Sequence, residues 1–199
     1  NCVTTELGYR LVTLALLGAL LTISAAFRRR ADRDGGQLKP GGERLLVLLR
    51  LAGLAVLLPV LLYIVLPEWV AWARFDAPTW LRWLGAAAAG GMVPLTYWLF
   101  RTIGTNISPS HATRVDHRLI TTGPYRYVRH PLYTFGTLAW LGIGLLSAMW
   151  WMLAGAILIS LFIVYRIPRE EAQLLAAFGA EYRQYQQRTG RFWPRLRSS

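Results

Sequence analysis

Long apolar stretches alternate with short polar segments along the whole chain. The apolar stretches cover residues 11–27, 45–66, 80–100 and 132–165. Each of the first three is about as long as one membrane-spanning helix, which needs about 20 residues. The fourth would be about 50 Å long as a single helix, whereas the hydrocarbon core of a bilayer is about 30 Å thick. We therefore predict two spans there, with a turn near residues 147–151, and five spans in total.

The polar segments differ in charge in a way that predicts their side of the membrane. Residues 28–30 are all arginine, residues 101–129 hold five arginines against one acidic residue, and residues 166–199 hold seven arginines. Cytoplasmic segments of membrane proteins carry such an excess of positive charge. Residues 67–79 have few positive charges and are expected on the opposite side. The N-terminus is thus predicted outside and the C-terminus in the cytoplasm.

The first apolar stretch has two interpretations. Ser24, Ala25 and Ala26 resemble the small-residue cleavage site of a signal peptide. The arginines that follow at once are typical of a stop-transfer segment facing the cytoplasm. We favour a retained span.

Composition agrees with an integral membrane protein and narrows the possible partners. Of 199 residues, 54% are hydrophobic and 16% are charged, whereas soluble domains carry about 25% charged residues. The net charge of +12 could indicate nucleic-acid binding, but the basic residues lie between apolar stretches and form no continuous stripe. We expect a lipid bilayer as partner and no nucleic acid. In a prokaryote this would be the inner or plasma membrane.

The small number of metal-ligating side chains argues against a metal site. Cys2 is the single cysteine, so a disulfide within the chain is impossible. His117 and His130 are thirteen residues apart with no acidic partner at motif spacing. A histidine beside a proline at the start of a span also has an ordinary structural role. We therefore predict no metal.

Two further patterns have structural explanations. The small residues 85–91 would allow close helix packing, or else form a wall against a cofactor or lipid tail. Residues 166–171 are predicted to open a helix with Pro168 in its first turn. Glu170 and Glu171 would then be favoured by the helix dipole without any catalytic role. Gly179 is expected to end or bend that helix. The arginines expected to contact anionic lipid headgroups are Arg191, Arg195 and Arg197.

The most chemistry-rich stretch is residues 117–133, H-R-L-I-T-T-G-P-Y-R-Y-V-R-H-P-L-Y. A second motif follows about thirty-five residues later and comprises Arg166, Glu170, Glu171, Phe178, Gly179, Glu181, Tyr182 and Tyr185. Together, the two motifs resemble the isoprenylcysteine carboxyl methyltransferase family. This family belongs to the membrane methyltransferases that also include phospholipid methyltransferases. The resemblance covers residues 104–194 and looks closest to archaeal and bacterial members.

The resemblance implies an all-α, polytopic enzyme in two parts. Residues 1–103 would form three N-terminal spans. Residues 104–199 would form the methyltransferase region, with a cytoplasmic motif, two spans and amphipathic tail helices. The methyl donor would be S-adenosylmethionine. By position in the motifs, the residues lining the cofactor would be His117, Leu119, Ile120, Gly123, Tyr125, His130, Pro131 and Glu171.

The resemblance also assigns the reacting centre. Arg166 and Glu170 would face it, and Arg129 is a further candidate for positioning a carboxylate. Methyl transfer is an in-line displacement, so most of the rate would come from positioning. An ionised carboxylate needs no general base, whereas an amine acceptor would need Glu170 or His130 as base. The faces of Tyr125 and Tyr133 would suit adenine or a sulfonium cation.

The sequence leaves several alternatives for the methyl acceptor and for the class of function. The expected acceptor is lipophilic, with the carboxylate of an isoprenylcysteine-like molecule first and a phospholipid amine or a thiol second. One rival is an NADPH-dependent membrane reductase of the sterol type, in which Arg126 and Arg129 would bind the extra phosphate. Another rival is a transport or scaffold protein without catalysis.

Overall fold

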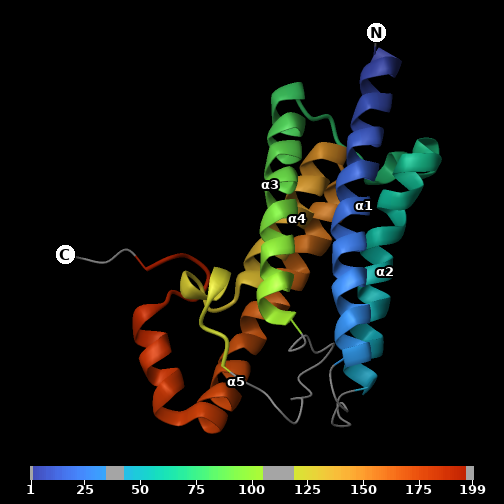
Figure 1. Cartoon of the computed structure of the whole chain (residues 1–199). Coiled ribbons are helices and arrows are strands. Elements are labelled where there is room, and N and C mark those ends of the chain that lie inside the picture. Colours follow the sequence, from blue (N-terminus) through green and yellow to red (C-terminus); the bar gives the residue numbers. More distant parts are fainter. Residues whose placement is uncertain (1, 35–42, 105–118, 196–199) are drawn as a thin grey trace.

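The structure, a computed structural model, describes residues 2–34, 43–104 and 119–195. In these residues the chain is helical, with no strand beyond two isolated bridges. The long helices are α1 (Cys2–Asp34), α2 (Glu43–Val65), α3 (Thr79–Ile103), α4 (Pro131–Ser147) and α5 (Trp150–Arg188). Two short 3-10 helices are η1 (Pro67–Ala73) and η3 (Gly123–Arg126) (Figure 1). The predicted all-α fold is confirmed.

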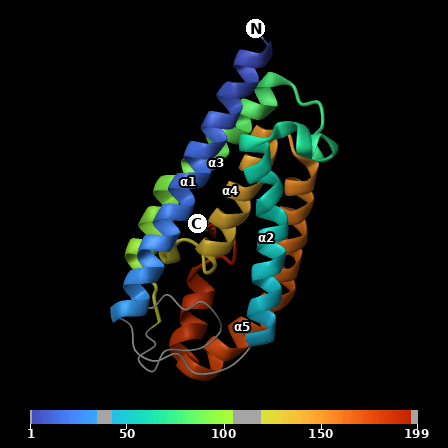
Figure 2. The same cartoon turned by 90° about the vertical axis from the view of Figure 1, so that its right-hand side faces the viewer.

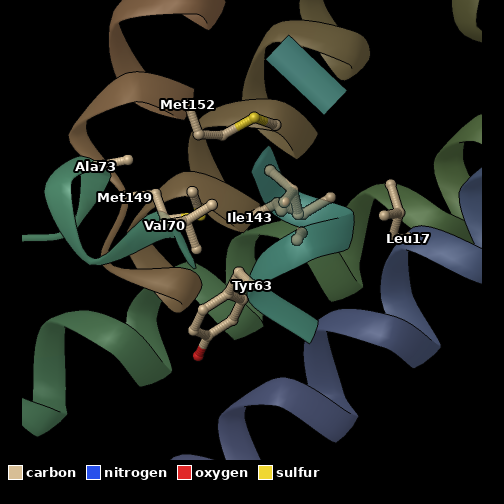
Figure 3. Packing of buried hydrophobic residues seen from close by; sticks show 9 residues of the cluster. Leu17, Tyr63, Val70, Ala73, Ile143, Met149 and Met152 are labelled. Carbon is tan, nitrogen blue, oxygen red and sulfur yellow. The ribbon is translucent and has the colours of Figure 1, made fainter. Parts of the chain in front are cut away.

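The helices form an elongated bundle with α4 in its interior (Figures 1 and 2). Helix α4 packs against α1, α3 and α5, and α2 packs against α1, α5 and η1. The largest buried cluster joins these elements, and Figure 3 labels members of it from α1, α2, η1, α4 and α5. It contains Leu17, Val60, Tyr63, Val70, Ala73, Ala89, Ile143, Met149 and Met152.

The crossing of α3 and α4 depends on two glycines. A Cβ on Gly85 would lie 2.6 Å from the carbonyl oxygen of Gly142, and one on Gly142 would lie 2.7 Å from the backbone nitrogen of Ala89. No side chain fits between the two backbones there. Gly91 faces open space. The expected helix packing of residues 85–91 is confirmed at Gly85 and Ala89.

An ion cluster joins four helices at the end of the bundle near the N-terminus. Glu6 of α1 accepts hydrogen bonds from Arg82 of α3 at 2.7 Å and from Arg74 and Tyr63 at 2.8 Å each. Arg82 is buried and also donates through Nε to the carbonyl of Leu146, near the C-terminus of α4. Sequence reasoning missed this cluster. The candidate functional site lies at the opposite end of α4.

Helix α5 corrects one sequence expectation and confirms another. We predicted a new helix starting at Pro168, which is wrong, because α5 continues through Pro168 without a break. A proline inside an apolar helix is tolerated where neighbouring groups satisfy the freed carbonyl. Glu170 and Glu171 therefore lie within a helix, and the dipole of a first turn does not explain them. The chain does turn at Gly179, with φ 53° and ψ −121°, so the last part of α5 folds back (Figure 1).

The predicted turn between the last two apolar segments is also confirmed. Helix α4 ends at Ser147, Ala148 adopts a left-handed conformation with φ 51°, and α5 begins at Trp150. Among the described residues, two helices are long and apolar enough to cross a membrane, Thr5–Ala31 and Trp150–Arg188. Two shorter apolar helices cover Leu51–Val65 and Pro131–Ser147. The number of spans and their orientation stay predictions.

Candidate functional site

His130 is the centre of the candidate site. It directly precedes α4, and Pro131, in the first turn, begins the helix because its fixed φ suits that position. The imidazole is buried, with Nε2 3.3 Å from Oε1 of Glu171 and Nδ1 3.9 Å from Oε1 of Glu170. Two glutamates of α5 thus face one histidine across 40 residues of sequence. Burial lowers the pKa of His130 and outweighs the opposing charge of Glu170.

Glu171 is the carboxylate that holds the site together. It accepts a hydrogen bond from Nε of Arg129 at 2.9 Å and one from Nη2 of Arg191 at 2.8 Å. Its side chain is 7% exposed. Burial would raise the pKa of Glu171, but the bonds from Arg191 and Arg129 outweigh it and lower that pKa. Glu171 is therefore a charged, paired group at neutral pH.

Glu170 has a different environment from its neighbour. It accepts a hydrogen bond from the hydroxyl of Tyr133 at 3.0 Å, and its side chain is 26% exposed. The ring of Tyr133 stacks on the imidazole of His130, with centroids 5.6 Å apart and planes 9° apart. Within the described residues, no arginine lies within ion-pair distance of Glu170. Glu170 is thus the carboxylate of this site that can receive a cation.

The C-terminal tail is fixed against the first motif. The backbone nitrogen of Arg129 donates to the carbonyl of Gly190 at 2.8 Å, and that of His130 donates to the carbonyl of Arg191 at 3.1 Å. Arg129 also donates through Nη1 to the carbonyl of Thr189. Gly190 leaves no room for a Cβ, which would meet the carbonyl oxygen of Trp193. Residues 189–192 act here as a strap, and we keep that name.

Arg191 of the strap has a partner that the sequence did not predict. Its guanidinium pairs with Glu171, but its side chain is 47% exposed, so the expected contact with anionic lipid headgroups stays a prediction. Sequence reasoning missed this pair, since the nineteen residues between Glu171 and Arg191 form no local pattern.

The other predicted cofactor residues lie around η3. Gly123 has φ 58° and faces Thr102 of α3, so a Cβ would meet that side chain. The carbonyl of Tyr125 accepts a hydrogen bond from the hydroxyl of Tyr185 at 2.7 Å. Burial, aided by the charge of Glu170, raises the pKa of Tyr125. Leu119 and Ile120 are half-buried just before η3.

Two predicted residues stand apart from the cluster. His117 lies outside the described residues. Arg166 lies one turn before Glu170 on the same face of α5, and its guanidinium lies over the ring of Phe162 at 5.6 Å. In the described part of the chain, no hydrogen bond or ion pair occupies Arg166, whereas Arg129 is fully engaged with Glu171 and the strap. Arg166 is therefore the arginine that could meet a bound carboxylate.

The described residues of the candidate site offer groups that could contact a methyl donor. Among them, no group of three or more His, Cys, Asp or Glu side chains could hold a metal ion. A sulfonium cation would find the carboxylate of Glu170 and the aromatic faces of Tyr125 and Tyr133. The buried hydroxyl of Tyr182 also has no hydrogen-bond partner in the described residues. Native proteins pair most buried polar atoms, so this hydroxyl calls for an explanation.

A sequence model of one family, phospholipid methyltransferase, matches residues 80–181. These residues include Arg129, His130 and both glutamates. The chain belongs to the phospholipid methyltransferase family. The resemblance that the two motifs carry is confirmed, since a Schizosaccharomyces pombe protein-S-isoprenylcysteine O-methyltransferase is 41% identical over 78 residues. That alignment covers 37% of this chain and 31% of the yeast protein.

Other relatives of this phospholipid methyltransferase family member are named as metal-resistance proteins. The cobalt-zinc-cadmium resistance protein CzcN of Cupriavidus metallidurans is 38% identical over 86 residues, covering 42% of this chain and 38% of that protein. Matched regions thus span less than two fifths of the length of these curated relatives.

A solved structure shows the same fold. The eukaryotic intramembrane Ras methyltransferase ICMT superposes with a TM-score of 0.55 at 20% identity, covering 92% of this chain and 67% of that chain. At this identity the likeness concerns the fold alone.

Proposed function

We propose that the protein is an integral membrane methyltransferase that uses S-adenosylmethionine to methylate a lipophilic acceptor. The observation that carries this is the position of His130 between Glu170 and Glu171. This group lies where the apolar helices α4 and α5 meet a polar tail, inside the region that the family model covers. A water-soluble donor and a lipid-tailed acceptor can meet at such a boundary.

When bound, S-adenosylmethionine supplies a methyl group on a cationic sulfonium. Glu170 would attract that cation, because no arginine among the described residues neutralises its carboxylate. Glu171, Arg129 and Arg191 would keep the strap closed and exclude water from the reacting centre. His130 would keep the two glutamates apart and, with Tyr133, provide an apolar face. Positioning of this kind is the main source of rate in a displacement.

Our first acceptor is the carboxylate of an isoprenylcysteine-like molecule. Arg166 supports this choice, because its guanidinium lies on the same face of α5 as Glu170 and is not hydrogen-bonded in the described residues. It would hold the acceptor carboxylate while Glu170 faces the donor. No proton has to be removed from an ionised carboxylate.

An amine acceptor, as in a phospholipid headgroup, is the second candidate. It is favoured by the lowered pKa of His130, since a neutral imidazole can accept a proton. In that case Glu170, 3.9 Å from Nδ1, would stabilise the imidazolium that forms. The reductase alternative is less well supported, because Arg129 is bound to Glu171 and to the strap and is not free for a phosphate.

Binding measurements on purified protein test the proposal. Isothermal titration in detergent with S-adenosylhomocysteine should give saturable binding, and titration with NADPH should give none. Tight NADPH binding without S-adenosylhomocysteine binding would replace the methyltransferase proposal with the reductase.

We also propose five spans, with the N-terminus outside and the region 104–199 facing the cytoplasm. Single cysteines in a Cys2→Ser background test this orientation. Glu68→Cys, exposed in η1, should react with an impermeant maleimide in intact cells, and Arg183→Cys, exposed on the tail, should react after lysis. The reverse pattern would overturn the orientation and leave the proposed reaction untouched.

A further inference from the structure

Tyr182 is a buried tyrosine whose hydroxyl is unsatisfied. Its side chain is 1% exposed, and the hydroxyl has no hydrogen-bond partner among the described residues. Native proteins pair most such groups, so each exception calls for an explanation. In the part of the chain that the structure describes, two other buried polar atoms share this property, the hydroxyl of Tyr9 and Nε of Arg74. Both belong to residues around the ion cluster of Glu6 and Arg82. Tyr182 is the one near the candidate site.

Tyr182 is linked to that site through its neighbours. It lies just after the turn at Gly179, on the part of α5 that folds back toward the first motif (Figure 1). Its ring is 6.0 Å from that of Tyr185, whose own hydroxyl is already bonded to the carbonyl of Tyr125. Burial, aided by the charge of Glu171, raises the pKa of Tyr182 to about 12. The hydroxyl is therefore a neutral donor at physiological pH.

We propose that Tyr182 is a binding residue for the methyl donor and that its hydroxyl donates a hydrogen bond to an acceptor oxygen or nitrogen of S-adenosylmethionine. This rests on the proposed function. The donor cofactor is the better occupant than the lipid acceptor, because Tyr182 lies on the polar tail beyond the apolar stretch that ends at residue 165. The folded-back end of α5 would thus be part of the cofactor pocket, not only a cover over it.

Replacing Tyr182 with phenylalanine should not lower the stability of the cofactor-free protein, but it should weaken cofactor binding. In the absence of cofactor, Tyr182→Phe removes an unsatisfied hydroxyl, so the apparent Tm should stay the same or rise. With cofactor, it removes a hydrogen bond, so the Kd for S-adenosylhomocysteine should rise about three- to tenfold. If the hydroxyl instead has a structural partner, Tyr182→Phe should lower the Tm in the absence of cofactor.

Thermal unfolding and isothermal titration of the purified full chain in detergent make the test. Tyr185→Phe is the matched comparison, because it breaks the bond to the carbonyl of Tyr125 and should lower the Tm without cofactor. Tyr165→Phe, on the exposed face of α5, should change neither quantity.

The outcomes separate the inference from the proposed function. Absence of S-adenosylhomocysteine binding to the wild-type chain rejects the proposed function, and the inference with it. If the wild type binds but Tyr182→Phe binds equally well, the inference is overturned and the function stands. A Tm that falls in Tyr182→Phe as it does in Tyr185→Phe also overturns the inference, because the hydroxyl then has a structural partner.

Discussion

Replacing Glu171 with glutamine should release the strap. The carboxylate is 7% exposed and the Arg129 side chain 11%, so this ion pair is buried. Removing one partner of a buried pair costs about 3–5 kcal/mol, because the other charge is left unpaired. Glutamine keeps one acceptor oxygen, which reduces the loss. The Arg191 side chain is 47% exposed, and its bond contributes about 0–1 kcal/mol. We expect a total destabilisation of about 2–4 kcal/mol.

Glu170→Gln is the matched control on the neighbouring position. Glu170 is bonded to the neutral hydroxyl of Tyr133 and is 26% exposed, so its replacement should change stability by less than about 1 kcal/mol. The two variants should also differ in how they affect ligand binding. Glu170→Gln should keep a closed strap and weaken binding of a sulfonium ligand, since the attracting charge is gone. Glu171→Gln should weaken all ligand binding through a loosened site.

Denaturant unfolding in detergent measures the stability difference, and limited trypsin digestion reports on the strap. Arg188 and Arg195 flank the strap and are exposed. Cleavage at these sites should be faster in Glu171→Gln than in the wild type or Glu170→Gln. Equal stability and equal digestion of the two variants would show that the Glu171 pairs contribute nothing to holding the tail.

Three further changes test separate parts of the structure. Gly142→Ala should destabilise the bundle strongly and reduce folded yield, because a Cβ there lies 2.7 Å from the backbone of α3, whereas Gly91→Ala should be neutral in the same thermal assay. Stability should fall as pH drops below about 6.5, because the folded pKa of His130 lies below its ordinary value and the unfolded chain takes up the proton first. His130→Gln should flatten the Tm profile between pH 6.5 and the folded pKa, and an unchanged slope would assign the effect to another group. Glu6→Gln should lower the Tm by leaving the buried Arg82 unpaired, with no change in the affinity for S-adenosylhomocysteine.

The helices could be predicted from the sequence because a bilayer leaves the backbone few choices. Every buried backbone group must be satisfied within the chain, so a long apolar stretch has to be helical. The turn at Ala148 followed from length alone, since 34 uncharged residues exceed the thickness of the membrane. The prediction at Pro168 failed because proline is a helix-start signal in water and also a tolerated interior residue in an apolar helix.

The candidate site could be predicted only in part from the sequence. The motifs pointed to His130 and Glu171, which the structure brings within 3.3 Å across 41 positions. The pairing of Glu171 with Arg191 and that of Glu6 with Arg82 were missed, because charges far apart in sequence give no periodic signal. The separate environments of Glu170 and Glu171 were equally hidden. Adjacent residues on a helix point in different directions, and only their tertiary neighbours distinguish them.

Transfer of a labelled methyl group tests the central claim most directly. Purified wild-type protein is incubated with radiolabelled S-adenosylmethionine and a membrane lipid extract, beside Glu170→Gln as control. We expect label in the organic phase for the wild type, released by base as for a carboxyl ester, and little label for the variant. A base-stable label would reject the carboxylate acceptor and favour an amine or a thiol. No organic-phase label, from a protein that also fails to bind S-adenosylhomocysteine, would contradict the methyltransferase account itself.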